Sequence, residues 1–219
     1  MGRQALVFDM DGVLVDVSES YREAIAQTVK HFTGLEAPAR LIQEYKNQGG
    51  WNNDWALAQK ICLDLGEGVS YQRVVDYFQS IFLGPEGLIH RERWIPEPGL
   101  LERLSERFDL AIFTGRPRAE ARLTLSRHAA GLRFDPIVAD GDIARPKPAP
   151  DGLLRIGELL PGRRLCYIGD TVDDARAARG AGVRFIGVAG EDRELACLLE
   201  REGASAVLQS VNQLEKALQ

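Results

Sequence analysis

Short apolar runs alternate with helical stretches along most of this chain. Residues 5–8 form a continuous apolar run that a glycine closes at Gly12, which is typical of a strand buried in a parallel sheet. Further runs predict strands at 110–113, 137–139, 165–168, 185–188 and 206–208. Helical periodicity fills the intervals at 100–107, 118–128, 152–159, 173–180, 193–201 and 211–218. Strands that alternate with helices indicate a parallel sheet with helices on both faces.

One long segment interrupts this alternation directly after the first strand. It shows only helical periodicity, over residues 18–32, 37–48, 54–65 and 70–83. Asp16 and Glu19 have the spacing of a capping box for the first of these helices. We therefore expect an α/β protein whose core is a Rossmann-like doubly wound parallel sheet, formed by residues 1–15 and 96–219. An all-α helical cap, residues 16–95, is inserted into it.

Composition narrows the class of protein. The 219 residues are 45% hydrophobic and 27% charged, and their net charge of −5 argues against a general nucleic-acid or membrane-surface binder. No apolar stretch is long enough to span a bilayer, and the first strand begins close to Met1, so we expect no signal peptide and a cytoplasmic location. Cys62, Cys166 and Cys197 lie far apart, outside any C-x-x-C pattern, and are expected to be reduced and buried. The three histidines lack metal-ligand spacing.

The first strand ends in two carboxylates. Asp9 and Asp11 are two residues apart, so they point the same way at the carboxyl end of the strand, where open α/β sheets bind ligands. Two such anions repel each other unless a cation or a proton compensates them. The alternative is an ordinary turn, because Asp-Gly is a common turn dipeptide.

Later strands also end in residues that can do chemistry. Thr114, Gly115 and Arg116 lie just before a helix, where a hydroxyl and backbone N–H groups can bind an anion, although an ordinary strand-to-helix turn has the same pattern. Lys147 stands between two prolines that restrict its backbone, and the alternative is a solvated loop. Acidic residues follow the strand at 165–168, and these can also be helix caps: Asp170, Asp173 and Asp174.

Taken in order, these residues resemble the haloacid dehalogenase superfamily, specifically its subfamily I phosphatase-like members with a helical cap after the first strand. The family pattern D-x-D-G-[VT]-L-x-D is matched by residues 9–16 without departure. The Thr, the Lys and the G-D-x-x-x-D pattern follow at Thr114, Lys147 and 169–174. The resemblance covers essentially the whole chain.

The resemblance implies a role for each matching position. Asp9 would be the nucleophile that forms an aspartyl phosphate, and Asp11 the general acid and base. Mg²⁺ would be held by Asp9, Asp170 and the backbone carbonyl of Asp11. Thr114 and Lys147 would bind the phosphoryl oxygens. Asp174, or alternatively Asp173, would orient Lys147 or a metal-bound water.

Other activities of the superfamily stay open to different degrees. Dehalogenating members lack the second aspartate, so Asp11 favours phosphate chemistry. Phosphonate-cleaving relatives use a cap lysine, but Lys30, Lys46 and Lys60 lie on predominantly polar helical faces. A phosphosugar mutase shares every core motif and is the alternative enzyme. A non-catalytic phosphometabolite-binding protein is the alternative outside catalysis, and no substituted catalytic position supports it.

Substrate choice is expected to lie in the cap loop that contains Trp51, Asn52, Asn53 and Asp54. Its indoles, amides and acid offer stacking and hydrogen bonds, and the alternative is a helix-to-helix turn with Asn53 or Asp54 as N-cap. This loop faintly resembles a subgroup associated with histidine biosynthesis, which suggests histidinol phosphate, with Asp54 pairing a substrate cation. Phosphoglycolate-like metabolites are the other candidates. Arg116 is expected either to contact the substrate or to pair with Asp140 or Asp142. The expected partner is thus a small phosphorylated metabolite, with no nucleic acid and no membrane, and the protein is a monomer or homodimer.

Overall fold

A six-stranded parallel sheet organises the larger part of the molecule. The computed structural model describes residues 3–218. The strands are β1 (Gln4–Phe8), β4 (Asp109–Pro117), β5 (Ile137–Asp140), β6 (Arg164–Gly169), β7 (Arg184–Val188) and β8 (Ala206–Leu208). Their order is β5-β4-β1-β6-β7-β8, and neighbouring strands run parallel. The predicted Rossmann-like doubly wound sheet is confirmed, although β4 continues beyond the predicted run, with a register shift after Phe113.

Strand β1 is central because its side chains are apolar on both faces. Residues 5–8 are fully buried, and β1 pairs with β4 on one side and with β6 on the other. Leu6, for example, is opposite Leu110 and Cys166. The residues that directly follow β1 therefore lie at the middle of the carboxyl edge of the sheet.

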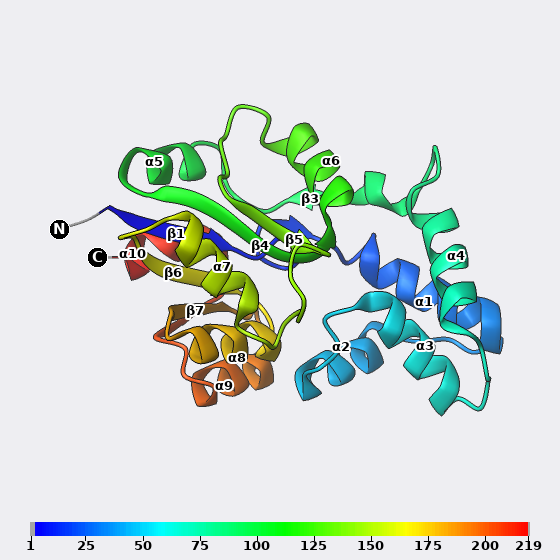
Figure 1. Ribbon diagram of the computed structural model, residues 1–219. Coiled ribbons are helices and arrows are strands. Elements are labelled where there is room, and N and C mark those ends of the chain that lie inside the picture. The colour runs from blue at the N-terminus through cyan, green and yellow to red at the C-terminus, as the bar shows by residue number, and fades with distance from the viewer. Residues whose placement is uncertain (1–2, 219) are drawn as a thin grey trace. The chain divides into compact units, whose positions relative to one another are not determined.

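Helices cover both faces of this sheet (Figure 1). Helices α5 (Leu100–Arg107) and α6 (Arg118–His128) lie on one face, and α7 (Asp151–Leu159), α8 (Val172–Ala181) and α9 (Arg193–Arg201) lie on the other. The helix predicted at 211–218 is divided into a 3₁₀ turn, η2 (Val211–Gln213), and α10 (Leu214–Ala217). Apolar side chains from β1, β4, β6, β7 and the second set of helices form one buried cluster.

The chain divides into two units by its internal contacts. One contains the residues up to Val15 and from Trp94 onward, and the other is Asp16–Arg93. The second unit holds helices α1 (Tyr21–Thr33), α2 (Ala39–Gln48), α3 (Asp54–Asp64) and α4 (Tyr71–Phe82) and a 3₁₀ turn, η1 (Leu88–Arg91). Its interior includes the packed rings of Tyr21, Phe78 and Phe82. Short strands β2 (Val15–Asp16) and β3 (Arg93–Trp94) pair where the chain passes between the units.

The expected capping box at the start of α1 is wrong. The N-cap is Ser20, whose side chain makes no capping hydrogen bond. Asp16 instead accepts a hydrogen bond from the Ser18 N–H and lies 3.0 Å from Arg93, while Glu19 lies 3.3 Å from the same arginine. An ion pair with a residue distant in sequence thus replaces the local cap.

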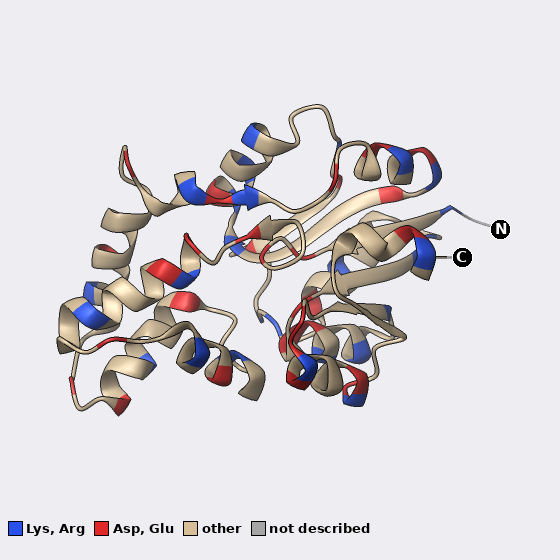
Figure 2. Ribbon diagram, turned by 180° about the vertical axis from the view of Figure 1, so that it is seen from behind, with Lys and Arg blue, Asp and Glu red and all other residues tan. Residues whose placement is uncertain are grey.

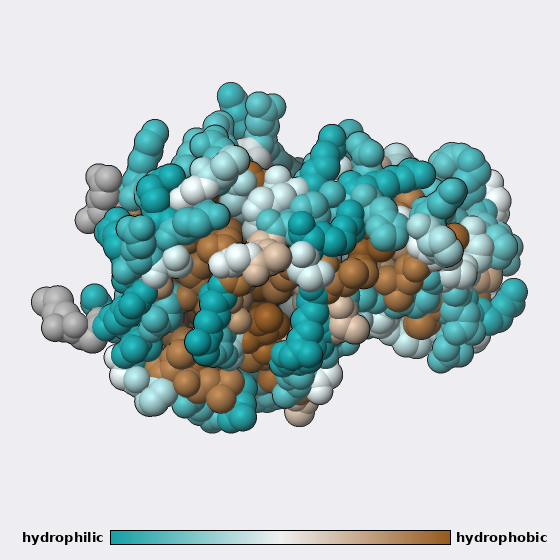
Figure 3. Space-filling model, turned by 90° about the horizontal axis from the view of Figure 1, so that it is seen from above, coloured by the Kyte–Doolittle hydropathy of each residue, from teal (hydrophilic) through white to brown (hydrophobic). Residues whose placement is uncertain are grey.

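The surface mixes charged and apolar side chains. Basic and acidic residues are interspersed over the ribbon in Figure 2. On the face drawn in Figure 3, hydrophobic side chains reach the surface between hydrophilic ones. None of the described helices is long and apolar enough to cross a membrane. Cys62 and Cys166 are buried as expected, whereas Cys197 is exposed, because it lies on a solvent-facing position of α9.

Candidate active site

The loop after β1 is tightly folded around a glycine. The Asp9 N–H donates to the Ile168 carbonyl at 2.8 Å, which extends the β1–β6 pairing by one residue. The Met10 carbonyl then accepts from the N–H groups of Leu14 and Val15 at 2.8 and 2.9 Å. Gly12 has a φ of 70°, a conformation that favours glycine, and a Cβ there would lie 1.9 Å from Asp170 Oδ2. The absence of a side chain at Gly12 thus lets this loop lie directly against the Asp170 carboxylate.

Lys147 lies at the centre of a buried charged cluster. Its Nζ is 3.0 Å from Asp9 Oδ1 and 2.7 Å from Asp174 Oδ1. The three residues are only 0–5% exposed. Buried charges are tolerated when they are paired and hydrogen-bonded, and this lysine has two carboxylate partners. The structure therefore brings three of the predicted site residues into direct contact.

The pKa values in this cluster reflect burial and mutual attraction. Burial raises the pKa of Asp9 to about 7; Lys147 opposes this rise, and Asp174 and Asp11 add to it. Burial also disfavours the charged form of Lys147, but Asp174 and Asp9 outweigh it and raise the pKa of the lysine above its ordinary value. For Asp174, burial acts upward, and Lys147 outweighs it, so the pKa lies below its ordinary value. Lys147 and Asp174 are thus an ion pair, and the pKa of Asp9 lies closer to neutral pH than that of Asp174.

Asp174 also holds the start of α8. Its Oδ2 accepts from the N–H and the hydroxyl of Thr171 at 3.0 and 2.6 Å, and from the Asp170 N–H at 3.2 Å. The Thr171 hydroxyl in turn accepts from the Asp174 N–H, which completes a capping box. Of the two alternatives left open by the sequence, Asp174 contacts Lys147, and Asp173 is buried on the first turn of the same helix.

Tyr167 is a member of this cluster that sequence analysis missed. Its hydroxyl donates to Asp174 Oδ1 at 2.6 Å and accepts from Lys147 Nζ at 2.9 Å. Burial and the neighbouring Asp174 raise its pKa well above the ordinary value, so the hydroxyl stays neutral. The available signal was a tyrosine within a buried strand, because a buried phenol needs a hydrogen-bond partner.

The end of β4 places Thr114 and Arg116 differently from each other. Thr114 is 2% exposed, and its hydroxyl accepts from the Arg116 N–H at 3.2 Å, while Gly115 is partly exposed. The Arg116 side chain is 1% exposed and lies 2.5 Å from Asp11 Oδ1. Arg116 thus pairs with Asp11, a partner that the sequence did not indicate, and its contact with substrate stays a prediction. Asp142 pairs with Arg118 instead.

The donor set at this edge suits a hard divalent cation. Asp9, Asp170 and Asp174 each offer a carboxylate oxygen within 4.8 Å of the others, and the Asp11–Gly12 backbone lies against Asp170. Four carboxylates gather at this edge (Asp9, Asp11, Asp170 and Asp174), and Lys147 and Arg116 are cations that pair with three of them. The clustered negative charge and the all-oxygen donors fit Mg²⁺.

The predicted cap loop belongs to the second unit. Asn53 is the N-cap of α3, accepting from the Ala56 N–H at 2.9 Å, and its amide donates to the Tyr71 hydroxyl. Asp54 lies 2.5 Å from Lys46, so its charge is already compensated, and the expectation of a carboxylate open to a substrate cation is not met. Trp51 packs edge-on against Tyr45, and both Trp51 and Asn52 are partly exposed.

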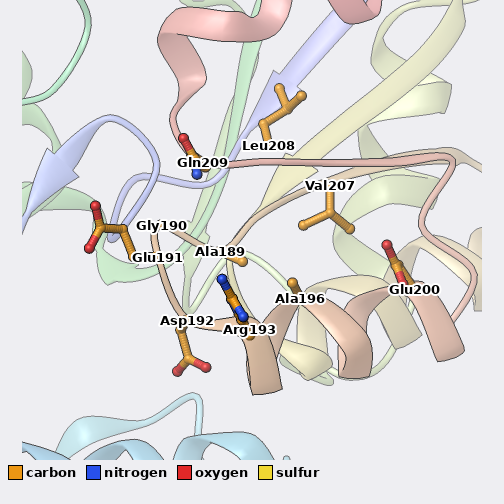
Figure 4. A pocket seen from close by; sticks show the side chains of 10 residues that line it. All are labelled: Ala189, Gly190, Glu191, Asp192, Arg193, Ala196, Glu200, Val207, Leu208 and Gln209. Atoms are coloured by element: carbon orange, nitrogen blue, oxygen red, sulfur yellow. The ribbon is translucent and has the colours of Figure 1, made fainter.

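A separate cavity lies beyond the ends of β7 and β8. It measures about 460 Å³ and is lined by the loop after β7, one side of α9 and the segment around Leu208 (Figure 4). Charged residues of both signs, including Glu191, Asp192 and Arg193, border it. None of the carboxylates or cations of the Lys147 cluster is among its lining residues.

The carboxyl edge of this doubly wound sheet thus carries carboxylates, a buried lysine and a hydroxyl, and it is the edge at which open α/β sheets bind their ligands. Comparison with known proteins identifies the family. Residues 4–182 match the model of the haloacid dehalogenase-like hydrolases, and the chain belongs to that family. The predicted class, a hydrolase of this superfamily, is thereby confirmed.

Similar proteins include a phosphatase and a hydrolase structure as well as a dehydratase. The chain is 35% identical over 214 residues to an imidazoleglycerol-phosphate dehydratase of Phytophthora nicotianae, a match that covers 92% of the chain but 47% of that protein. The chain thus spans about half the length of this relative. It is 24% identical to a phosphoglycolate phosphatase of Psychrobacter arcticus, with 86% of the chain and 84% of that protein covered. A hydrolase structure from Pseudomonas syringae superposes with a TM-score of 0.76 at 23% identity, covering 99% of the chain and 98% of that structure, and so shares the fold.

Proposed function

We propose that this protein is a Mg²⁺-dependent phosphatase that hydrolyses a small phosphomonoester through an aspartyl phosphate on Asp9. The observation that carries the proposal is the buried contact of Asp9 with Lys147, beside Asp170 and Asp174. A carboxylate that is held against a lysine at the sheet edge can approach a phosphorus atom whose oxygens the lysine binds. Family membership and relatives named as phosphatases support the same reaction.

The proposed reaction has two steps. In the first, a lone pair of the Asp9 carboxylate forms a bond to phosphorus, the bond to the ester oxygen breaks, and that oxygen takes a proton from Asp11. In the second, water attacks the phosphorus, its proton returns to Asp11, and the bond between Asp9 and phosphorus breaks to release phosphate. Lys147 and the Thr114 hydroxyl bind the equatorial oxygens, and Asp174 and Tyr167 keep the Lys147 ammonium in place.

Asp9, Asp170 and the Asp11 backbone carbonyl would hold the cation, with Asp174 close behind them. Mg²⁺ bound there supplies positive charge that offsets the charge building up on the phosphoryl oxygens. The ionised form of Asp9, which burial disfavours and which the nucleophile requires, would be favoured by that added positive charge.

The substrate proposed is a small metabolite, and two chemistries are favoured. One relative is named for phosphoglycolate, and another is named for an imidazole-bearing phosphate, although it is matched over about half its length. Histidinol phosphate carries an imidazole and an amine as well as a phosphate, so it belongs to the second of these two chemistries. Because Asp54 is paired with Lys46, the substrate cation would have to be bound elsewhere than on Asp54.

The test is phosphate release with Mg²⁺ from a panel containing phosphoglycolate, histidinol phosphate, sugar phosphates and an aryl phosphate. Asp9→Asn should abolish release, because an amide is a far weaker nucleophile. Asp140→Asn is the matched control, since Asp140 is an exposed carboxylate at the end of β5. A phosphorylated intermediate should appear in the intact mass of the wild type and be absent from Asp9→Asn.

Conversion of one sugar phosphate into its isomer without net phosphate release would show a mutase instead. Mg²⁺ binding with neither release nor isomerisation would point to a binding protein. Equal activity of Asp9→Asn and Asp140→Asn would refute the assignment of the nucleophile.

A further inference from the structure

Arg116 contacts the proposed acid–base residue rather than solvent. Its Nε donates to Asp11 Oδ1 at 2.6 Å, and its Nη2 lies 2.5 Å from the same oxygen. The side chain of Asp11 is 30% exposed, whereas that of Arg116 is 1% exposed. A substrate can therefore reach Asp11, while Arg116 lies behind the carboxylate.

A second contact fixes the guanidinium from the helix that follows. Arg116 Nη1 donates to the Thr124 hydroxyl on α6 at 2.9 Å, and Thr124 is fully buried. The guanidinium is planar, so hydrogen bonds at both ends define its orientation. Arg116 thus connects the loop after β1 with a helix that packs on β4.

We infer that Arg116 is a positioning residue that assigns the two oxygens of Asp11 different tasks, Oδ1 as a permanent hydrogen-bond acceptor and Oδ2 as the atom that carries the proton. This inference rests on the proposed phosphatase function and deepens it. Arginine is a donor only, so Asp11 Oδ1, which accepts from Nε and lies 2.5 Å from Nη2, has no place for a proton on the side of the guanidinium. A carboxyl group protonated on Oδ2 still accepts at Oδ1, so the contact persists in both proton states.

The assignment specifies the path of the proton. In the first step the proton on Asp11 Oδ2 passes to the ester oxygen, which keeps the electron pair of the broken bond to phosphorus. In the second step a proton of the attacking water returns to Oδ2 as the water oxygen bonds to phosphorus and the Asp9 oxygen leaves. Rotation of the Asp11 carboxyl group would exchange its oxygens, and the contact with Arg116 prevents this.

The test compares two esters whose leaving groups differ in their need for a proton. Nitrophenolate leaves readily unprotonated, whereas an alkoxide from glycerol phosphate requires an acid. Arg116→Gln should lower kcat/KM for glycerol phosphate about 100-fold and for p-nitrophenyl phosphate by about threefold or less, because general acid catalysis contributes about 10²–10⁴ in rate. Arg118→Gln is the matched control. Arg118 lies two residues after Arg116 and pairs with Asp142, so its replacement should leave both values near wild type.

Equal losses for the two esters, or a gain for glycerol phosphate, would overturn the inference; a gain would mean that Arg116 holds Asp11 away from its task. Thr124→Val, which removes the second contact in a similar volume, should give the same selective loss in smaller degree.

A cycle of unfolding measurements decides the contact independently of turnover. Arg116→Gln should raise the unfolding equilibrium constant roughly tenfold more in the protein that keeps Asp11 than in the Asp11→Asn protein, because directly paired residues couple. Equal effects would overturn the inference. Inactivity of the wild type on every ester would instead refute the proposed function, and the cycle would still report on the contact.

Discussion

Gly12→Ala is the substitution whose effect follows most directly from the structure. A Cβ at this position would lie 1.9 Å from Asp170 Oδ2 and 2.5 Å from its Cγ, far inside van der Waals contact. The φ of 70° adds a backbone cost, since an L side chain is strained there. Either the loop after β1 or the Asp170 carboxylate has to move.

Two separate terms make up the expected loss of stability. The left-handed conformation costs about 1–2 kcal/mol for alanine. Overpacking in a closely packed site adds about 1–3 kcal/mol. A displaced Asp170 should also weaken the cation site, and the Mg²⁺ concentration for half-maximal activity should rise about 10–100-fold, as for other disturbed metal shells.

Gly182→Ala separates the two terms. Gly182 has a φ of 65° at the end of α8, and nothing lies within 4 Å of its ideal Cβ. Urea unfolding in EDTA should therefore show only the backbone cost for Gly182→Ala and a larger loss for Gly12→Ala. Phosphate release against Mg²⁺ concentration should be shifted for Gly12→Ala alone. If the two variants matched in stability and in Mg²⁺ dependence, the close approach of Gly12 to Asp170 would be refuted.

Three further predictions concern the buried cluster. Tyr167→Phe removes the hydroxyl between Lys147 and Asp174. It should lower the free energy of unfolding in urea by about 1–3 kcal/mol and raise KM. Unchanged values would contradict the place of Tyr167 in the site. Asp174→Asn leaves Lys147 with one carboxylate partner and should lower the free energy of unfolding by about 3–5 kcal/mol. The alkaline limb of its pH–rate profile should also move to lower pH, because Asp174 helps to raise the pKa of Lys147. Burial raises the pKa of Asp9 to about 7, whereas the pKa of an Asp in the unfolded chain is ~4. Between these two pH values the folded state therefore holds a proton that the unfolded state lacks. In EDTA the stability of the wild type should therefore fall as the pH rises through this window, and Asp9→Asn should remove that slope; equal slopes would count against the assignment.

The sheet was largely predictable because its strands are short apolar runs between glycines and polar turns. The order of the chemical residues along the chain also indicated the edge at which they gather, since each follows a different parallel strand. Helix ends were less predictable where a distant residue decided them: Asp16 had the spacing of a cap, but Arg93 takes its charge.

Side-chain direction was the main limit in the site. Arg116 is long and has five donors, and nothing in its neighbours along the chain distinguishes Asp11 from Asp140 or Asp142 as its partner. Asp54 looked open to a ligand because Lys46 is eight positions away and on another helix. Tyr167 looked like one more buried strand residue, and only its hydroxyl suggested a polar role.

The central place of β1 has a consequence for how the chain is made. Its partners, Asp109–Ile112 on β4 and Arg164–Ile168 on β6, leave the ribosome long after it does. At a synthesis rate of about 5–20 residues per second, roughly 10–30 s pass between the synthesis of β1 and that of its second neighbouring strand. The contiguous segment Asp16–Arg93 contains its own contacts and is complete well before then. During synthesis, β1 is therefore an exposed apolar segment next to a part that can already fold, and it is the segment on which a chaperone would be expected to act first.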